Sequence, residues 1–289
     1  MISLRHTIVG SGRFQLSVES LDLPVGMTLL VGRNGAGKST LLRLLATAIP
    51  PDGGSIEYAG RRVSTDLPLI RRNIGYLPTG LELYEEMSPR KLLRYMCSLK
   101  GIEEPGEPEL WLEKLRFGGN PDHPIRTLSQ GQKQLIGIAQ ACLGSPPFLL
   151  LDEPLGGLDR WEQKQVIHEL ALLSQRSVVV VATHELNDWS HAADRLLWLD
   201  EGVVRFYGSA RMWVSGLKSK VWSGTLPAAA LAGLDEERLL FCRVHEERQE
   251  AEIRWIGEPP PDGIGSEAEM TLEDAYFIRR YALSRLGRG

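Results

Sequence analysis

Residues 27–40, MTLLVGRNGAGKST, decide the fold of this 289-residue chain. The segment opens with an apolar run over residues 27–31, of the kind that forms a strand buried on both faces. A glycine-rich loop follows, and leucines then recur at helical spacing over residues 40–48. A strand, a glycine-rich loop and a helix in this order are typical of a phosphate-binding loop.

The loop over residues 32–39, called the phosphate loop below, satisfies the pattern G-x-x-x-x-G-K-[ST]. Its glycines let backbone N–H groups turn toward phosphate oxygens, and the helix that follows directs the positive end of its dipole at the same anion. We expect Lys38 to reach the β and γ phosphates of a nucleotide and Ser39 to ligate Mg²⁺. The residues assigned to nucleotide binding here are Gly32, Asn34, Gly35, Ala36, Gly37, Lys38, Ser39 and Thr40.

Two carboxylates follow a second apolar run, FLLLDE over residues 148–153. A buried strand that ends in acidic residues places them where open α/β sheets bind their ligands. We expect Asp152 to hold Mg²⁺ and Glu153 to accept the proton of an attacking water as a general base. A strand end of this type is by itself more often a turn, so the assignment depends on the phosphate loop.

The composition and the hydropathy pattern predict a folded protein without a membrane span. Hydrophobic residues make up 43% of the chain and charged residues 24%, and the length suggests about two structural units. The most apolar stretch, residues 226–234, is about half as long as a bilayer span, and the first ten residues lack a signal-peptide core. The net charge of −4 argues against a nucleic-acid partner, and three scattered cysteines favour a reducing cytoplasm.

Residues 128–132, LSQGQ, add the motif that suggests a family. The run precedes a helical pattern, and Ser129 is an N-cap candidate. In combination with the phosphate loop and residues 152–153, it resembles the LSGGQ signature sequence of ABC ATPases, with Gln130 in place of the first glycine. Over residues 1–214 the chain resembles the nucleotide-binding domain of an ABC transporter. Residues 80–102, GLELYEEMSPRKLLRYMCSLKGI, resemble the helical subdomain of the bacterial exporter-type branch.

This resemblance implies an α/β fold with a P-loop NTPase core. The core would combine a parallel sheet, an antiparallel β subdomain and a helical subdomain over about residues 80–145. The pattern changes after residue 214: two strand-like runs over 238–257, a break at prolines 259–261 and a helix over 272–286 predict a small α+β appendage. We therefore expect an ATPase domain over residues 1–214 and an accessory domain over 215–289.

The resemblance also implies a site shared between two subunits. Family members dock head to tail, so Ser129, Gly131 and Gln132 of one copy would cap the γ-phosphate held by Lys38 of the other. His184, which follows the run VVVVAT, resembles the switch histidine that contacts the γ-phosphate and the attacking water. The implied ligands are ATP and Mg²⁺, and the implied partners are a membrane permease and a second ATP-binding subunit, either an identical copy or a paralogue.

Two departures from the family pattern affect the site. Thr79 stands where many relatives have the glutamine that ends the Q-loop, so a metal contact there would use a shorter side chain. The only aromatic residue before the phosphate loop is Phe14, and its alternation with Leu16 and Val18 predicts that it points into the core. Phe14 and His6 remain weak candidates for the adenine contact.

We expect the energising subunit of a membrane exporter, bound peripherally to the cytoplasmic face of the cell membrane and hydrolysing ATP. Two other functions remain open: a soluble ABC ATPase, and a nucleotide-dependent regulatory switch. The soluble ribosome or DNA remodellers of the family carry tandem domains or a long insertion, whereas this chain has one motif set. The switch remains open because of Thr79 and the absence of a clear adenine-stacking residue.

Overall fold

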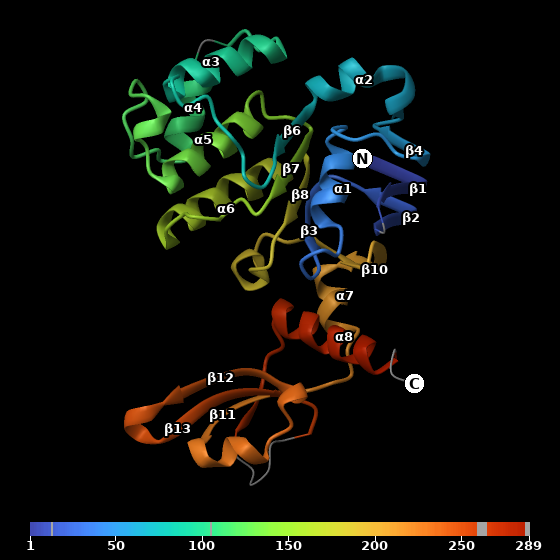
Figure 1. Ribbon diagram of the computed structural model, residues 1–289, viewed down its shortest axis with the longest axis vertical. Helices are drawn as coiled ribbons and strands as arrows, with labels where there is room; N and C mark the ends of the chain where they lie inside the picture. The colour runs from blue at the N-terminus through green and yellow to red at the C-terminus, as the bar shows by residue number, and fades with distance from the viewer. Residues whose placement is uncertain (13, 105, 259–264, 287–289) are drawn as a thin grey trace. The chain divides into compact units, whose positions relative to one another are not determined.

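We analysed a computed structural model that describes residues 1–12, 14–104, 106–258 and 265–286 (Figure 1). The chain forms two compact units. Unit 1 contains Met1–His184 and His191–Gly208, and unit 2 contains Glu185–Ser190 and Ser209–Gly289. The phosphate loop and both predicted carboxylates lie in unit 1.

Unit 1 is organised by a ten-stranded mixed sheet in the order β5-β4-β1-β2-β10-β9-β3-β8-β7-β6. Its strands are β1 Ile2–Ser11, β2 Phe14–Leu23, β3 Gly26–Val31, β4 Gly53–Tyr58, β5 Arg61–Arg62, β6 Ile74–Leu77, β7 Phe148–Asp152, β8 Val178–Ala182, β9 Arg195–Asp200 and β10 Val203–Ser209.

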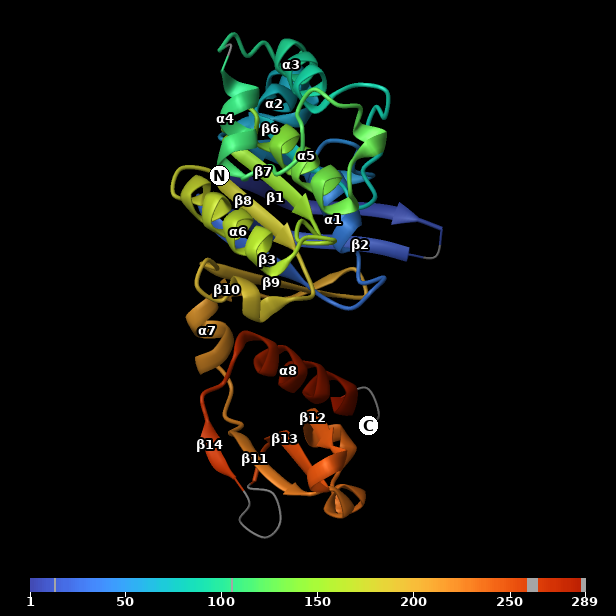
Figure 2. The same cartoon turned by 90° about the vertical axis from the view of Figure 1, so that its left-hand side faces the viewer.

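Parallel pairing joins β9, β3, β8, β7 and β6. Every residue of β3, β7 and β8 is buried, as the continuous apolar runs predicted. Leu30 of β3 and Asp152 of β7 both pair with Ala182 of β8, so the three strands end at the same level. The helix α6, Arg160–Ser174, packs along β8 (Figure 2).

The other half of the sheet begins with an N-terminal hairpin. β1 and β2 pair antiparallel from Ile2↔Leu23 to Ser11↔Phe14, and β4 pairs antiparallel with the other edge of β1. Their apolar faces join one hydrophobic core with α1, Lys38–Leu45, and with residues of β7 and β8. The phosphate loop follows β3 inside the parallel half, and the helix α1 after it packs in the core that both halves share.

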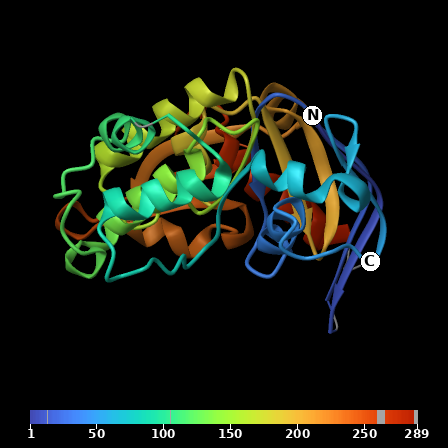
Figure 3. The same ribbon diagram turned by 90° about the horizontal axis from the view of Figure 1, so that it is seen from above.

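Helices dominate residues 63–142, as the sequence predicted for much of this region. They are α2 Val63–Arg72, α3 Pro89–Lys100, α4 Glu107–Lys114, the 3-10 helix η1 Ile125–Thr127 and α5 Gln130–Cys142. Ser88 caps α3 by accepting a hydrogen bond from the Lys91 N–H (3.4 Å), and Pro89 occupies the first turn, where its missing N–H costs nothing. Seen from above, the green helical part and the blue N-terminal strands lie on opposite sides of unit 1 (Figure 3).

Unit 2 is a small α+β fold, as expected from the sequence. Its sheet has the order β12-β13-β11-β14, and its pairing is antiparallel. Ile278 of α8 packs against Val221 and Ile256 of the sheet. The elements of unit 2 are η2 Leu186–Trp189, α7 Ala210–Ser215, β11 Val221–Pro227, η3 Ala228–Gly233, η4 Glu236–Arg238, β12 Leu239–His245, η5 Glu246–Arg248, β13 Glu250–Ile256, β14 Ser266–Ala268 and α8 Leu272–Leu286.

The division between the units differs from the boundary that the sequence suggested at residues 214 and 215. The fully buried Trp213 of α7 donates its Nε1–H to the carbonyl of Leu272 (2.9 Å). Asn187 of η2 likewise donates to Glu273 of α8 (2.8 Å). These long-range contacts attach α7 and η2 to unit 2. The predicted break at prolines 259–261 lies outside the described residues.

In the part of the chain that the structure describes, no helix is both long enough and apolar enough to cross a membrane.

The close approach of α5 to the sheet gives a stability prediction. A Cβ on Gly75 of β6 would lie 2.0 Å from the carbonyl oxygen of Ala141, so Gly75→Ala must displace α5. We expect a loss of about 1–3 kcal/mol in the free energy of unfolding, measured by urea titration. Gly53→Ala is the control, because a Cβ there meets nothing within 4 Å; equal stability of the two variants would contradict the packing.

Candidate functional site

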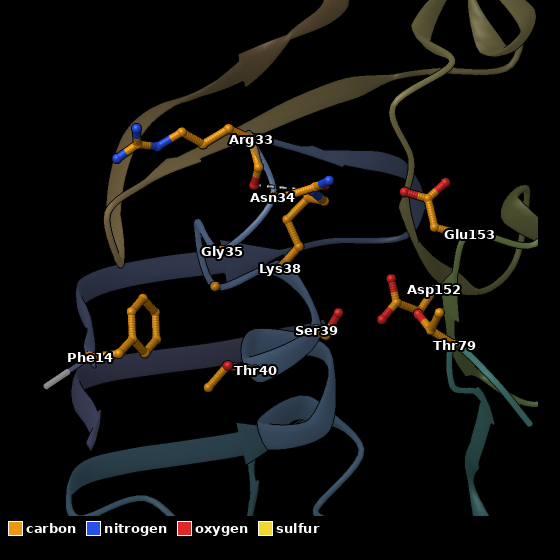
Figure 4. Close-up of a pocket in the computed structure, with 11 residues that line it drawn as sticks. Phe14, Arg33, Asn34, Gly35, Lys38, Ser39, Thr40, Thr79, Asp152 and Glu153 are labelled. Carbon is orange, nitrogen blue, oxygen red and sulfur yellow. Dashed lines mark hydrogen bonds between the residues drawn. The ribbon is translucent and has the colours of Figure 1, made fainter. Parts of the chain in front are cut away.

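A pocket of about 500 Å³ opens beside the phosphate loop. One side is formed by the loop and the first turn of α1, and the other by the ends of β6 and β7 (Figure 4). Phe14 lies at one end and the carboxylates of Asp152 and Glu153 lie toward the other (Figure 4). The pocket is lined by Phe14, Arg33, Asn34, Gly35, Gly37, Lys38, Ser39, Thr40, Thr79, Asp152 and Glu153.

The phosphate loop needs glycine at two of its turns. Gly37, the N-cap of α1, has φ 106°, and a Cβ there would lie 2.7 Å from the Phe14 ring. Gly32 has φ 156°, and a Cβ there would lie 2.4 Å from the carbonyl oxygen of Leu199. The loop can therefore keep this path only without side chains at these positions. The same path leads into the N-terminus of α1, and the free N–H groups at a helix N-terminus bind anions.

Lys38 provides a buried cation at the start of α1. Its side chain crosses the loop, and Nζ donates to the carbonyls of Gly32 (2.7 Å) and Arg33 (3.4 Å). Burial lowers the pKa of the Lys38 ammonium, while the nearby Glu153 and Asp152 carboxylates oppose that shift. The Lys38 ammonium is thus held by neutral carbonyls, in a pocket that also contains two acidic groups. Phosphate oxygens, which are charged, could replace these carbonyls as its hydrogen-bond acceptors.

The oxygen atoms of three side chains face this part of the pocket. Asp152 is only 3% exposed at the end of β7, and Ser39 and Thr79 lie near it (Figure 4). No group of three His, Cys, Asp or Glu side chains with metal-binding geometry occurs among the described residues. One carboxylate with hydroxyl groups is nevertheless the donor set that Mg²⁺ uses when phosphates complete its coordination. The residues present therefore fit Mg²⁺ bound together with a nucleotide.

Glu153 pairs with His184 across neighbouring strands. The two side chains approach to 3.0 Å between Glu153 Oε2 and His184 Nδ1. Glu153 has the left-handed φ of 51°, and its N–H donates to the carbonyl of Ala182 (2.9 Å). Parallel pairing of β7 with β8 thus brings together two groups that the sequence placed after separate strands. His184 is not among the residues that line the pocket, although Glu153 is.

The LSQGQ run, called the signature segment below, forms the N-terminus of α5. The Ser129 side chain accepts from the Gln132 N–H (3.2 Å), and Gln132 accepts from the Ser129 N–H (3.0 Å), which makes a reciprocal capping box. Gly131 lies against the loop before α6, where a Cβ would approach the Gly157 carbonyl to 2.8 Å. Ser129, Gly131 and Gln132 do not line the pocket of their own chain.

The expectation that Phe14 points into the core describes only part of its surroundings, because Phe14 packs against the hydrophobic core and also lines the pocket. Phe14 is half-buried and shares a face of β2 with the buried Leu16 and Val18. It lies at the first residue of the strand, where the core ends, so the same alternation places its ring against Gly37 and in the pocket wall. His6, the other weak candidate, is not a pocket-lining residue.

Arg33 and Gln134 lie at or next to the site, although no sequence motif predicted them there. Arg33 lines the pocket and forms ion pairs with Asp200 (3.5 Å) and Glu201. Gln134 of α5 donates to the backbone carbonyl of Glu153. Neither contact has a local signal, because each joins segments far apart in the chain. Gly32 and Ala36 belong to the phosphate loop but do not line the pocket.

Comparison with known proteins identifies the family. The ABC transporter family model matches residues 19–156. The daunorubicin/doxorubicin resistance ATP-binding protein DrrA of Streptomyces peucetius is 30% identical over 266 residues, covering 88% of this chain and 80% of DrrA. The molybdenum import ATP-binding protein ModC of Vibrio cholerae is 32% identical over 222 residues, or 73% of this chain and 59% of ModC. The chain spans only 23% of ABC transporter A family member 1 of Dictyostelium discoideum, at 29% identity.

Solved structures confirm the fold. An ATP-binding subunit of an ABC transporter superposes with a TM-score of 0.69 at 24% identity, over 75% of this chain and 92% of that one. The ATP-binding cassette MJ0796, in a dimeric post-hydrolysis state with ADP and Pi, gives 0.65 at 23% identity, over 72% and 98%. The extent of the match to DrrA and the agreement in fold lead to one conclusion: the chain belongs to the ABC transporter family and is one of its ATP-binding ATPases.

Proposed function

We propose that this chain energises a membrane exporter by hydrolysing ATP in a site completed by a second ATP-binding subunit. The observation that supports this proposal most directly is the pocket itself. It sets Lys38 and Ser39 of the phosphate loop opposite Asp152 and Glu153 (Figure 4). One cavity therefore holds a cation that can bind phosphates, a carboxylate that can bind a metal ion and a carboxylate that can accept a proton. The remaining assignments follow from what each side chain can do there.

The phosphate loop binds the nucleotide. Backbone N–H groups of residues 32–40 and the N-terminus of α1 receive the phosphates, and Lys38 Nζ leaves the loop carbonyls to contact the β and γ phosphates. Ser39 and Asp152 would hold Mg²⁺, with Thr79 reaching it through water. Bound Mg²⁺ neutralises charge on the phosphates. Phe14 contributes an aromatic edge at the far end of the pocket, where the base would lie.

Glu153 and His184 act on the attacking water. The Glu153 carboxylate accepts a proton from water as the water oxygen bonds to the γ-phosphorus and the bond to the leaving ADP oxygen breaks. His184, whose imidazole Nδ1 lies 3.0 Å from Glu153 Oε2, orients that carboxylate and contacts the γ-phosphate. Lys38 stabilises the charge that develops on the transferred phosphoryl group.

The second subunit supplies what the pocket lacks. Ser129, Gly131 and Gln132 are absent from the pocket of their own chain, and the start of α5 presents the positive end of a 13-residue helix. In a head-to-tail pair, the signature segment of one subunit would cap the γ-phosphate bound by the other. ATP binding would then close the pair, and hydrolysis would open it. The second subunit is either another copy or a paralogue.

Coupling to transport requires a membrane permease. We assign the ATPase function to unit 1 and an accessory role to unit 2, and we place the permease contact near Tyr84 and Tyr95. These two rings are 58% and 44% exposed and pack edge to face, with centroids 6.5 Å apart. The protein would then lie on the cytoplasmic face of the membrane. We propose export because the name of DrrA describes drug resistance, although the name of another relative, ModC, describes import.

Replacing the proposed general base tests the chemistry. Glu153→Gln keeps the shape of the side chain but cannot accept the proton, so we expect kcat to fall by about 10²–10⁴ in a phosphate-release assay. Nucleotide-bound dimers should accumulate in size-exclusion chromatography with light scattering, because closure does not need the proton transfer. Glu113→Gln, on the exposed side of α4, is the control. Unchanged turnover in Glu153→Gln would rule out the role of this carboxylate.

Removing the buried cation tests nucleotide binding. Lys38→Ala loses charge-assisted contacts to the phosphates, which are worth about 1.5–3 kcal/mol, so the Kd for ATP should rise at least tenfold in isothermal titration calorimetry. Lys220→Ala removes an exposed lysine that pairs with Glu267 in unit 2 and should leave the Kd unchanged. Equal affinities of the two variants would contradict the assigned site.

Coupling to a permease is tested in the native host. Tagged Glu153→Gln should be recovered from membranes solubilised with ATP and Mg²⁺, together with a polytopic membrane protein in near-equal amount, identified by mass spectrometry. The same preparation without nucleotide is the control. Recovery only from the soluble fraction would overturn the exporter proposal. In that case, tight ATP binding with hydrolysis no faster than in solvent would favour the regulatory switch.

A further inference from the structure

Gln134 joins the signature helix to the backbone of the proposed general base. It lies on α5, one turn after Gln130, and its side chain is half-buried. Gln134 Nε2 lies 3.3 Å from the carbonyl oxygen of Glu153 and 3.0 Å from that of Pro154. The orientation of the amide is settled by chemistry, since two carbonyl oxygens can only accept and the –NH₂ group has one hydrogen for each.

Glu153 needs such support because its backbone conformation is unfavourable. Its φ of 51° lies in the left-handed region, which a residue with a Cβ rarely adopts. The N–H of Glu153 is held by Ala182 of β8 (2.9 Å), and its carbonyl also accepts from Gly156 N (3.3 Å). Among these described contacts to the Glu153 backbone, the Gln134 contact is the one made by a side chain, and Gln134 lies on the helix α5.

The direction of the Glu153 side chain depends on that conformation. A residue that continued β7 in an extended conformation would direct its side chain to the face of the sheet opposite that of Asp152, whereas the left-handed turn brings the carboxylate beside His184 and into the pocket wall. A single amide nitrogen can reach two successive carbonyls only while the chain turns at this point. The Gln134 bonds therefore favour the turned state over the extended one.

We propose that Gln134 is a positioning residue, which fixes the Glu153 carboxylate for proton transfer and links its position to the signature segment on the same helix. This inference rests on the proposed function of Glu153. A shift of the α5 N-terminus, when it engages the nucleotide of the second subunit, is passed along a rigid helix to the carbonyls of Glu153 and Pro154. Closure of the dimer and placement of the base are then one event.

The test compares two glutamines with the same kind of bond. Gln134→Met removes the amide with little change in volume. Gln165→Met is the matched control, because Gln165 Nε2 donates to the carbonyl of Lys114 (2.9 Å) on α4, away from the β7 end. We expect at least a tenfold fall in kcat for Gln134→Met, with KM and the Kd for ATP within twofold of the wild type. The control should keep its kcat, and both variants should lose similar thermal stability.

A donor-only replacement and a double variant test whether Gln134 acts through Glu153. Gln134→Lys returns N–H donors to the two carbonyls and should recover most of the lost kcat. Adding Gln134→Met to Glu153→Gln should not lower the residual rate further, because the positioned group is already disabled. A further tenfold fall in the double variant, or full kcat in Gln134→Met, would overturn the inference. If Glu153→Gln itself kept its turnover, the proposed function of Glu153 would fail instead.

Discussion

Parallel pairing of β3, β8 and β7 is the constraint on which the site depends. The register aligns Leu30 and Asp152 with the same residue, Ala182, so the strands end together. Lys38, Asp152 and His184 are widely separated in the chain and have no local reason to meet. The common edge of the sheet brings their segments together, because Lys38 follows the loop after β3, Asp152 is the last residue of β7 and His184 comes shortly after β8. A shift of one residue in the register of β7 would turn Asp152 to the opposite face.

Backbone conformation at the strand ends then sets the direction of each group. Gly37 and Glu153 both have positive φ, at 106° and 51°. The first lets the phosphate loop turn into the N-terminus of α1 beside Phe14, and the second turns a carboxylate toward His184. A glycine adopts this conformation at little cost, whereas a glutamate needs its neighbours to hold it. The stabilising contacts around Glu153 are therefore part of the site and not only of the fold.

Two helix starts lie side by side next to this edge. Ser129 caps α5 and Asp159 caps α6, each in a reciprocal capping box. Gly131 and Gly157 approach so closely that a side chain on Gly131 would meet the Gly157 carbonyl. The signature segment, the loop before α6 and the backbone of Glu153 thus form one connected patch. A subunit that docked there would contact the signature segment next to the backbone of the proposed base.

The sequence by itself determined the local elements and the motifs. Apolar runs predicted the buried strands, and glycine spacing predicted the phosphate loop, because each depends on nearby residues. Only the tertiary structure decided that Phe14 lies in the pocket wall, that α7 belongs to unit 2 and that Gln134 reaches Glu153. The roles of Thr79 and the signature segment stay predictions. Contacts between distant segments follow from sheet register and helix packing, and no local pattern encodes either one.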